Sequence, residues 1–172
     1  MKKDALIQSL QECGAIQHGH FVLTSGAISD YYVDIKKAST NPMVLKTIAQ
    51  YMKPFTKGYD LIAGMELGAV PLAVALSLET QIPYVIIRKE KRAHGTGKQI
   101  EGPEVQHKRV LLLEDVTTSG GSLIQSIQIL KRNHAILQEV IVVVDRESGA
   151  KELIINHGLE FHPLLTVADI LP

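Results

Sequence analysis

The hydrophobic and polar positions of the chain follow two different periods, which predict an alternation of helices and strands. Residues 4–13 carry apolar side chains at helical spacing, and residues 41–52 form a second such segment. The second segment begins with an Asn-Pro pair, which is typical of a helix start. Between the two helices, residues 20–35 predict two short strands around a Ser/Gly-rich turn.

From residue 60 onward, short apolar runs alternate with amphipathic segments. The runs consist mainly of Val, Ile and Leu, and unbroken runs of this kind are typical of strands that are buried on both faces. The pattern therefore predicts an α/β fold, in which a central parallel β-sheet is flanked by helices on both sides. We expect strands at 60–63, 83–87, 110–113, 140–144 and 159–165, and helices at 68–78, 120–132 and 150–157.

Composition narrows the class of protein. The 172 residues include 18 Lys+Arg and 18 Asp+Glu, so the formal net charge is zero, which argues against a nucleic-acid partner. The single cysteine, Cys13, cannot form a disulfide within the chain, and the longest apolar runs are too short to span a bilayer. No segment near the N-terminus has the pattern of a signal peptide. We therefore expect one domain, residues 1–172, that is cytoplasmic and has no membrane partner.

Residues 88–109 interrupt the alternation. This segment holds seven Lys or Arg, two His and three Gly, with few apolar residues. A charge run by itself favours a solvated surface loop. However, a connection this long in a compact domain is typically a functional lid or disordered, and this one leaves the carboxyl end of a strand, where ligands bind in open α/β sheets. We therefore expect a mobile loop over a binding site.

The clearest chemical signal follows the strand predicted at 110–113. Two adjacent carboxylates precede a turn rich in hydroxyls and glycines, and a predicted helix comes next. Glycines allow the backbone to turn sharply and to approach a ligand, and the N–H groups at a helix N-terminus favour a phosphate. The segment therefore predicts an anion cradle composed of Glu114, Asp115, Val116, Thr117, Thr118, Ser119, Gly120, Gly121 and Ser122.

The two carboxylates, Glu114 and Asp115, indicate which anion the cradle takes. Beside a bound phosphate they would repel it, unless they faced hydrogen-bond donors. The hydroxyls of a ribose are such donors, and Mg²⁺ helps to balance the charge. The segment therefore predicts a site for a ribose 5-phosphate. The structural alternative is a Ser/Thr-rich helix cap with ordinary acidic neighbours, which accounts for neither the acid pair nor the double glycine.

Together with three further segments, this cradle resembles a known family. The stretch from Glu114 to Ser122 is similar to the signature of type I phosphoribosyltransferases, which bind phosphoribosyl pyrophosphate (PRPP). Residues 21–32, 88–95 and 144–147 resemble, in the same order, the N-terminal segment, the mobile catalytic loop and the orotate-binding strand end of orotate phosphoribosyltransferases. The four segments in this order are similar to that family in particular.

The resemblance implies a fold, a reaction and an assembly. The fold is that of type I phosphoribosyltransferases, with residues 1–40 forming a small hood over the base site and residues 88–109 forming the mobile catalytic loop. The reaction transfers ribose 5-phosphate from PRPP to orotate, and it yields orotidine 5′-monophosphate and pyrophosphate in pyrimidine (UMP) biosynthesis. The implied cofactor is Mg²⁺, held mainly by the substrate. The implied assembly is a homodimer in which the loop of one subunit reaches the site of the other.

The resemblance also implies roles for individual residues. Arg92, His94 and Asp115 are the implied catalytic residues. Arg146 would pair with the carboxylate of orotate, which suits a planar bidentate donor. Residues 64–68, Gly-Met-Glu-Leu-Gly, match the family's pyrophosphate loop. The implied substrate-binding residues are Tyr32, Val33, Arg88, Lys89, Arg92, His94, Glu114, Asp115, Val116, Thr117, Thr118, Ser119, Gly120, Gly121, Ser122 and Arg146.

Two positions depart from the family pattern. Thr24 and Arg92 stand where many members carry a lysine. Arg92 keeps the positive charge but does not readily lose a proton, and Lys91 is adjacent to it. His94 supplies a proton donor that titrates near neutral pH. These positions leave the identity of the catalytic proton donor open.

Two other functions are compatible with parts of the sequence. The first is a phosphoribosyltransferase that acts on a purine, but a purine has no carboxylate to pair with Arg146. The second is a non-catalytic regulator that senses PRPP. A regulator could dispense with the cationic loop at 88–94, and the chain has no recognisable DNA-binding motif. The sequence therefore favours the enzyme that acts on orotate.

Overall fold

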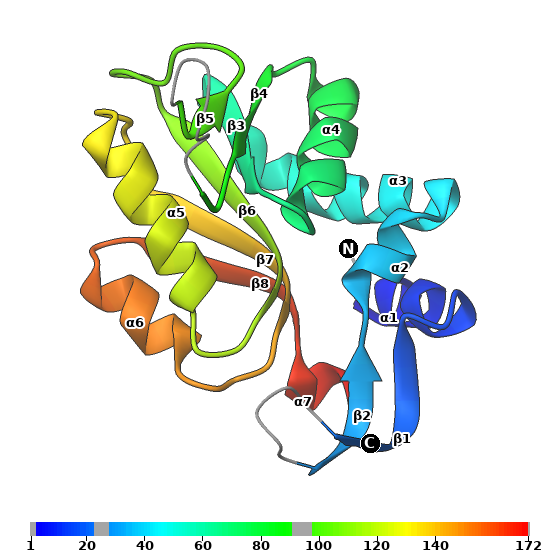
Figure 1. The fold of residues 1–172 in the computed structure, drawn as a ribbon. Coiled ribbons are helices and arrows are strands. Elements are labelled where there is room, and N and C mark those ends of the chain that lie inside the picture. Colours follow the sequence, from blue (N-terminus) through cyan, green and yellow to red (C-terminus); the bar gives the residue numbers. More distant parts are fainter. Residues whose placement is uncertain (1–2, 23–27, 91–97, 172) are drawn as a thin grey trace.

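A computed structural model describes residues 3–22, 28–90 and 98–171 (Figure 1). The N-terminal part begins with a helix and a separate pair of antiparallel strands. Three short helical elements follow before the central sheet begins. These elements are α1 (Lys3–Glu12), β1 (Ile16–Val22), β2 (Ile28–Val33), α2 (Ile35–Ser39), α3 (Pro42–Met52) and the 3₁₀ turn η1 (Lys53–Thr56).

The rest of the chain builds a six-stranded sheet with strand order β5-β4-β3-β6-β7-β8. Five of the strands run parallel to their neighbours, and only the short edge strand β5 is antiparallel. The fold predicted from the sequence is thereby confirmed. The elements are β3 (Leu61–Met65), α4 (Ala69–Thr80), β4 (Tyr84–Ile87), β5 (Ile100–Glu101), β6 (Val110–Thr117), α5 (Gly121–Arg132), β7 (Glu139–Asp145), α6 (Ala150–Asn156), β8 (Glu160–Thr166) and α7 (Val167–Ile170).

Helices cover both faces of this sheet, as Figure 1 shows for α3 and α4 on one side and α5 and α6 on the other. Successive residues of a strand point to opposite faces. On β6, Leu111 and Leu113 pack in the core beneath α1, α3 and α4, while Val110 and Leu112 pack in the core beneath α5 and α6. This two-sided burial explains why the strands read as unbroken apolar runs.

The structure differs from the sequence-based expectation at the end of β6. The strand was expected to end at residue 113, but it continues to Thr117. It continues because β7 pairs with it along this stretch, with Val116 opposite Val144 and Thr117 opposite Asp145. Glu114 and Asp115 therefore lie inside the strand and are buried, with 5 % and 7 % of their surface exposed.

Four short elements, α2, η1, β5 and α7, lie outside the predicted set. Each has two to five residues, which is too short for a hydrophobic period to appear in the sequence. β1 also begins earlier than expected, at Ile16. Among the helices that the structure describes, none combines the length and apolar character needed to cross a membrane. The division into a hood at 1–40 and a catalytic loop at 88–109 stays a prediction.

Candidate active site at the carboxyl edge of the sheet

The strand order places a crevice between β3 and β6. After β3 the chain adds β4 and β5 on one side, and it then returns to place β6 on the other side of β3. The connections that follow β3 and β6 therefore leave the sheet in opposite directions. In open α/β sheets this divergence at the carboxyl ends is where ligands bind. The loop at 64–68 and the predicted anion cradle meet at this point.

Asp115 lies at the centre of this crevice. Its side chain contacts the backbone of Gly68 so closely that a Cβ atom built on Gly68 would lie 2.0 Å from Asp115 Oδ2. The only lysine or arginine paired with this carboxylate in the described residues is Lys36 of α2, whose Nζ lies 3.3 Å from Oδ2. The negative charge of Asp115 raises the pKa of Lys36. Three segments that are distant in sequence are thus joined at one carboxylate.

Glu114 makes its contacts on the other side of β6. Its Oε2 accepts a hydrogen bond of 2.8 Å from the Ser122 hydroxyl of α5, and its Oε1 accepts one of 3.2 Å from the Asp115 backbone N–H. Burial, together with the neighbouring charge of Asp115, raises the pKa of Glu114 to about 7. The two adjacent acids therefore occupy different environments, and Glu114 exchanges a proton near neutral pH.

The turn after β6 forms the predicted anion cradle. Gly120 adopts φ of +84°, which a residue with a side chain rarely adopts, and it directly precedes the first turn of α5. The first N–H groups of a helix have no partners within the helix. Thr118 and Ser119 are exposed, whereas Thr117 is buried and its hydroxyl has no hydrogen-bond partner in the described chain. The turn therefore presents donors at the carboxyl edge.

Arg146 follows β7 and connects the sheet to the N-terminal strand pair. Its backbone N–H donates to the carbonyl of Thr117 at 2.9 Å, which places it beside the cradle. Its guanidinium Nε lies 3.3 Å from the Tyr31 hydroxyl, and its Cζ lies 5.1 Å from the centre of the Tyr31 ring. The guanidinium is therefore held between the cradle and β2.

The start of the cationic loop is fixed by several hydrogen bonds. The backbone N–H of Lys89 donates to Glu66 Oε1 at 2.9 Å, and its carbonyl accepts from Gln125 Nε2 of α5 at 2.8 Å. The Arg88 N–H donates to the carbonyl of Gln99 at 2.8 Å. Arg88 also lies 3.7 Å from Glu101. The base of the loop is thus anchored to the loop after β3 and to α5.

The structure brings together many of the predicted residues but assigns some of them other contacts. Asp115, the turn at 117–121 and Arg146 meet at the crevice. Ser122, which was expected to face the phosphate, instead donates its hydroxyl to Glu114. Val33 packs against the main core. The predicted catalytic residues Arg92 and His94 lie outside the described residues, as does Thr24.

Two residues of this site were missed by sequence reasoning. Lys36 was not considered, although Asp34 caps the helix that carries it and gives a recognisable helix start. Tyr31 was not among the predicted substrate-binding residues, but its ring and hydroxyl contact Arg146. Its neighbour Tyr32 is 43 % exposed and stacks near Phe21, with ring centres 5.6 Å apart. No local sequence signal marks Tyr31, because its contact with Arg146 joins residues 115 positions apart.

Comparison with known proteins defines the class first. Residues 41–156 match the family model described as the phosphoribosyl transferase domain. The fold and the strand-to-cradle arrangement are those of this class of transferase, in which the catalysed step moves a phosphoribosyl group.

Relatives define the family within this class. The orotate phosphoribosyltransferases of Pyrococcus abyssi and Pyrococcus horikoshii are 51 % and 52 % identical to the chain, cover 98 % of it, and match over 94 % and 92 % of their own lengths. The crystal structure of Mycobacterium tuberculosis orotate phosphoribosyltransferase in complex with PRPP superposes with a TM-score of 0.81 at 29 % identity, covering 98 % of each chain. The chain belongs to the orotate phosphoribosyltransferase family.

The contact between Gly68 and Asp115 predicts that Gly68→Ala destabilises the protein. A Cβ atom 2.0 Å from Oδ2 would displace the buried carboxylate, and overpacking of this kind costs about 1–3 kcal/mol. Thermal unfolding without ligand measures the effect. Gly121→Ala is the matched control, because no atom lies within 4 Å of its added Cβ and helical Ala is favoured. Equal melting temperatures for Gly68→Ala and the wild type would contradict the close contact.

The raised pKa of Glu114 predicts a pH-dependent loss of stability. Because the folded protein holds this proton more tightly than the unfolded chain, the stabilisation is present below the ordinary value of 4.5 and disappears as the pH rises through about 7. Glu114→Gln keeps an acceptor for Ser122 and removes the charge. At about pH 8 its free energy of unfolding should exceed that of the wild type by on the order of 2–3 kcal/mol.

The comparison is made by chemical denaturation at several pH values. The difference between Glu114→Gln and the wild type should shrink toward about pH 4, where both side chains are neutral. Glu104→Gln serves as the control, because the Glu104 side chain is 87 % exposed. A pH-independent difference for Glu114→Gln would show that the carboxyl does not titrate with folding.

Proposed function

We propose that the chain transfers the ribose 5-phosphate group of PRPP to orotate. The bond from C1′ to a ring nitrogen of orotate forms as the bond from C1′ to the pyrophosphate oxygen breaks. Pyrophosphate leaves, and the ring nitrogen gives up its proton. The product is orotidine 5′-monophosphate, which is an intermediate of UMP synthesis. Membership of the family and the position of Arg146 support this proposal.

The cradle and Asp115 supply the binding of PRPP. The amides and hydroxyls of the turn at 117–121 hold the 5′-phosphate at the start of α5, where the helix favours an anion. Asp115 accepts hydrogen bonds from the ribose hydroxyls. Transfer through an oxocarbenium-like state depends on positioning and on stabilising charge more than on a nucleophile. Asp115, held against Gly68 and Lys36, gives a fixed carboxylate for that purpose.

The position of Arg146 is the observation in the structure that carries the assignment to orotate. Its backbone N–H is bonded to Thr117 of the cradle, and its guanidinium Nε lies 3.3 Å from the Tyr31 hydroxyl of β2. A guanidinium matches a carboxylate in planar, bidentate geometry. Orotate has a carboxylate, and purine bases lack one. Purine transfer and a regulatory role therefore remain alternatives without a comparable supporting contact.

Mg²⁺ fits this site as an ion that arrives with the substrate. Lys36 Nζ lies 3.3 Å from Asp115 Oδ2, so this carboxylate already has a positive partner. PRPP phosphate and hydroxyl oxygens are the hard ligands that Mg²⁺ prefers. When bound, Mg²⁺ neutralises charge on the pyrophosphate leaving group. The cytoplasmic location of the protein stays a prediction.

The cationic loop completes the site in this proposal. Arg88, Lys89, Arg92 and His94 neutralise the pyrophosphate as it leaves, and closure of the loop excludes water. The anchors of Lys89 on Glu66 and Gln125 fix the point from which the loop extends. We further propose a homodimer in which the loop of each subunit serves the site of the other.

The proposed role of Arg146 predicts a selective loss of orotate binding. Removing one partner of a desolvated charged pair costs about 2–5 kcal/mol. Arg146→Ala should therefore raise the KM for orotate by about 30-fold or more, with a small effect on PRPP binding. The loss of orotate absorbance on addition of PRPP and Mg²⁺ measures the reaction, with hypoxanthine and adenine as competing substrates.

Arg132→Ala is the matched control, because Arg132 is exposed at the end of α5, away from the cradle. Arg146→Lys tests whether charge alone suffices, and we expect it to restore only part of the orotate affinity. Unchanged orotate kinetics in Arg146→Ala would remove this residue from the site. Turnover of a purine in place of orotate would overturn the proposed function.

Shared sites predict that two inactive variants complement each other. One variant carries Arg92→Ala and His94→Ala in the loop, and the other carries Asp115→Asn at the cradle. Each should be nearly inactive alone. In a mixed dimer, one site would combine the intact loop of one chain with the intact cradle of the other, so activity should return in proportion to the mixed species.

Subunit exchange is verified by mass spectrometry of the mixed sample. If each loop serves its own chain, both sites of the mixed dimer keep one defect, and mixing restores no activity. That result would refute the shared site and leave the transferase assignment intact.

A further inference from the structure

A second group of chemically active side chains lies at the amino-terminal ends of β7 and β8, opposite the carboxyl ends that carry the candidate active site. Glu139 is the first residue of β7, and Glu160 and His162 are the first and third residues of β8. Glu139 and Glu160 are register partners, and His162 lies on the same face as Glu160. Asp145, at the carboxyl end of β7, is six residues from Glu139, or roughly 20 Å at about 3.3 Å per residue. The cluster is therefore separate from the transferase site.

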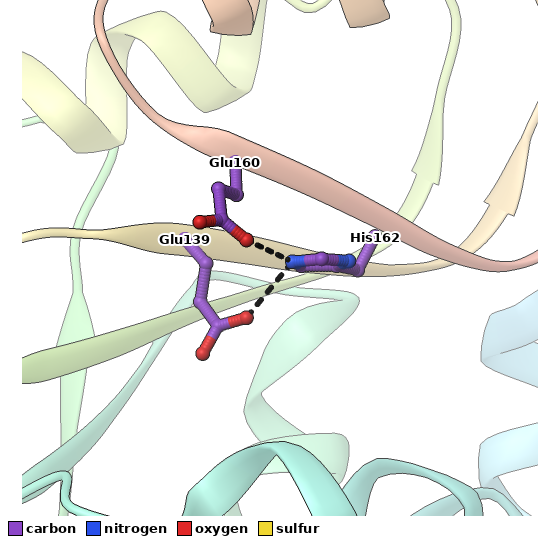
Figure 2. A group of neighbouring side chains, drawn as sticks. All are labelled: Glu139, Glu160 and His162. Carbon is purple, nitrogen blue, oxygen red and sulfur yellow. Dashed lines mark hydrogen bonds and ion pairs between the residues drawn. The ribbon is translucent and has the colours of Figure 1, made fainter.

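Two carboxylates converge on one ring nitrogen in this cluster (Figure 2). His162 Nε2 lies 3.0 Å from Glu139 Oε2 and 3.1 Å from Glu160 Oε2. The three atoms all lie within 4.8 Å of one another. In a tetrahedral zinc site with bonds of about 2.0–2.1 Å, neighbouring ligand atoms are about 3.3 Å apart. The two distances from His162 Nε2 to the carboxylate oxygens are therefore close to the distance between neighbouring ligand atoms in such a site.

The charges of the cluster are not balanced by other side chains. Within the described residues, neither Glu139 nor Glu160 pairs with a lysine or an arginine, and His162 is the only basic partner of both. A single imidazole nitrogen can offer at most one proton to two carboxylates. The cluster therefore holds more carboxylates than its single base can neutralise.

The surrounding residues orient these three side chains. The Tyr59 hydroxyl donates to Glu139 Oε1 at 2.8 Å, which fixes the orientation of this carboxylate. Phe55 lies against the His162 ring, with ring centres 5.3 Å apart. Hydrogen bonds and packing of this kind, one shell outside the ligands, are typical of protein metal sites. Glu139 is only 17 % exposed in its side chain, which limits its alternative positions.

We propose that Glu139, Glu160 and His162 bind a divalent transition-metal ion, with Zn²⁺ as the ion that suits one nitrogen and two carboxylate ligands. A water molecule would occupy the fourth coordination position of the ion. Glu139, Glu160 and Tyr59 line an open groove of about 560 Å³. The side chains of His162 and Glu160 are 32 % and 77 % exposed, so an ion can reach the ligands from solvent. Imidazole favours Zn²⁺ over Mg²⁺, which separates this site from the magnesium that accompanies PRPP.

The proposal predicts one equivalent of bound Zn²⁺ per chain. Protein stripped with a chelator is titrated with Zn²⁺ by calorimetry, in the presence of a large excess of Mg²⁺. The melting temperature of the full chain should rise with Zn²⁺, because an ion that binds only the folded state stabilises it. His162→Gln and Glu139→Gln should each lower the Zn²⁺ affinity at least tenfold, and Tyr59→Phe should lower it by about 10–100-fold.

Two further variants keep the test decisive. Glu160→Gln should weaken Zn²⁺ binding without loss of the fold, since the Glu160 side chain is 77 % exposed. His134→Gln is the control, because His134 and His107 form a surface pair with ring centres 6.3 Å apart that could take up zinc adventitiously. Retained binding in His134→Gln, with loss in the cluster variants, supports the proposal.

Three results would overturn it. The first is the absence of stoichiometric Zn²⁺ binding, which would leave the cluster as a proton-linked bridge between two strands. The second is unchanged affinity in both His162→Gln and Glu160→Gln. The third is loss of the site in His134→Gln alone, which would place the zinc on the surface histidines. None of these results bears on the transfer reaction, which is assayed separately.

Discussion

The burial of the Asp115 carboxylate between β3 and β6 is the constraint on which the transferase site depends. Its oxygen lies where a side chain on Gly68 would stand, and its one lysine partner, Lys36, comes from α2. A buried carboxylate is costly unless it is paired or hydrogen-bonded. The pairing therefore ties the loop after β3, the strand β6 and the N-terminal segment into one arrangement. The ligand donors follow neighbouring strands: the turn at 117–121 follows β6, and Arg146 follows β7.

The adjacent acids show how one strand supports two chemical tasks. Because side chains alternate along β6, Asp115 contacts Gly68 and Lys36, whereas Glu114 accepts a hydrogen bond from Ser122 of α5. Glu114 is desolvated and has a pKa raised to about 7. Asp115 has a cationic partner and remains the carboxylate suited to ribose hydroxyls. The two acids therefore have different partners and surroundings, although they are neighbours in the sequence.

The two ends of the parallel sheet have different chemistry. At the carboxyl ends, diverging loops and a helix N-terminus gather donors for an anion. At the start of β7 and β8, Glu139, Glu160 and His162 gather acceptors instead, and they meet no lysine or arginine among the described residues. The first end suits a phosphorylated sugar, and the second suits a cation. The length of β7 keeps the two sites apart.

The sequence by itself determined the fold class, the order of the long elements and the cradle, because hydrophobic period and local turn chemistry are properties of neighbouring residues. It also indicated Asp115 and Arg146. Only the tertiary structure decided the partners: Lys36 on Asp115, Tyr31 on Arg146, Ser122 on Glu114, and the meeting of Glu139 with His162. These pairs join segments separated by 8 to 115 residues. Their contacts follow from strand register, face and helix packing, which no local pattern encodes.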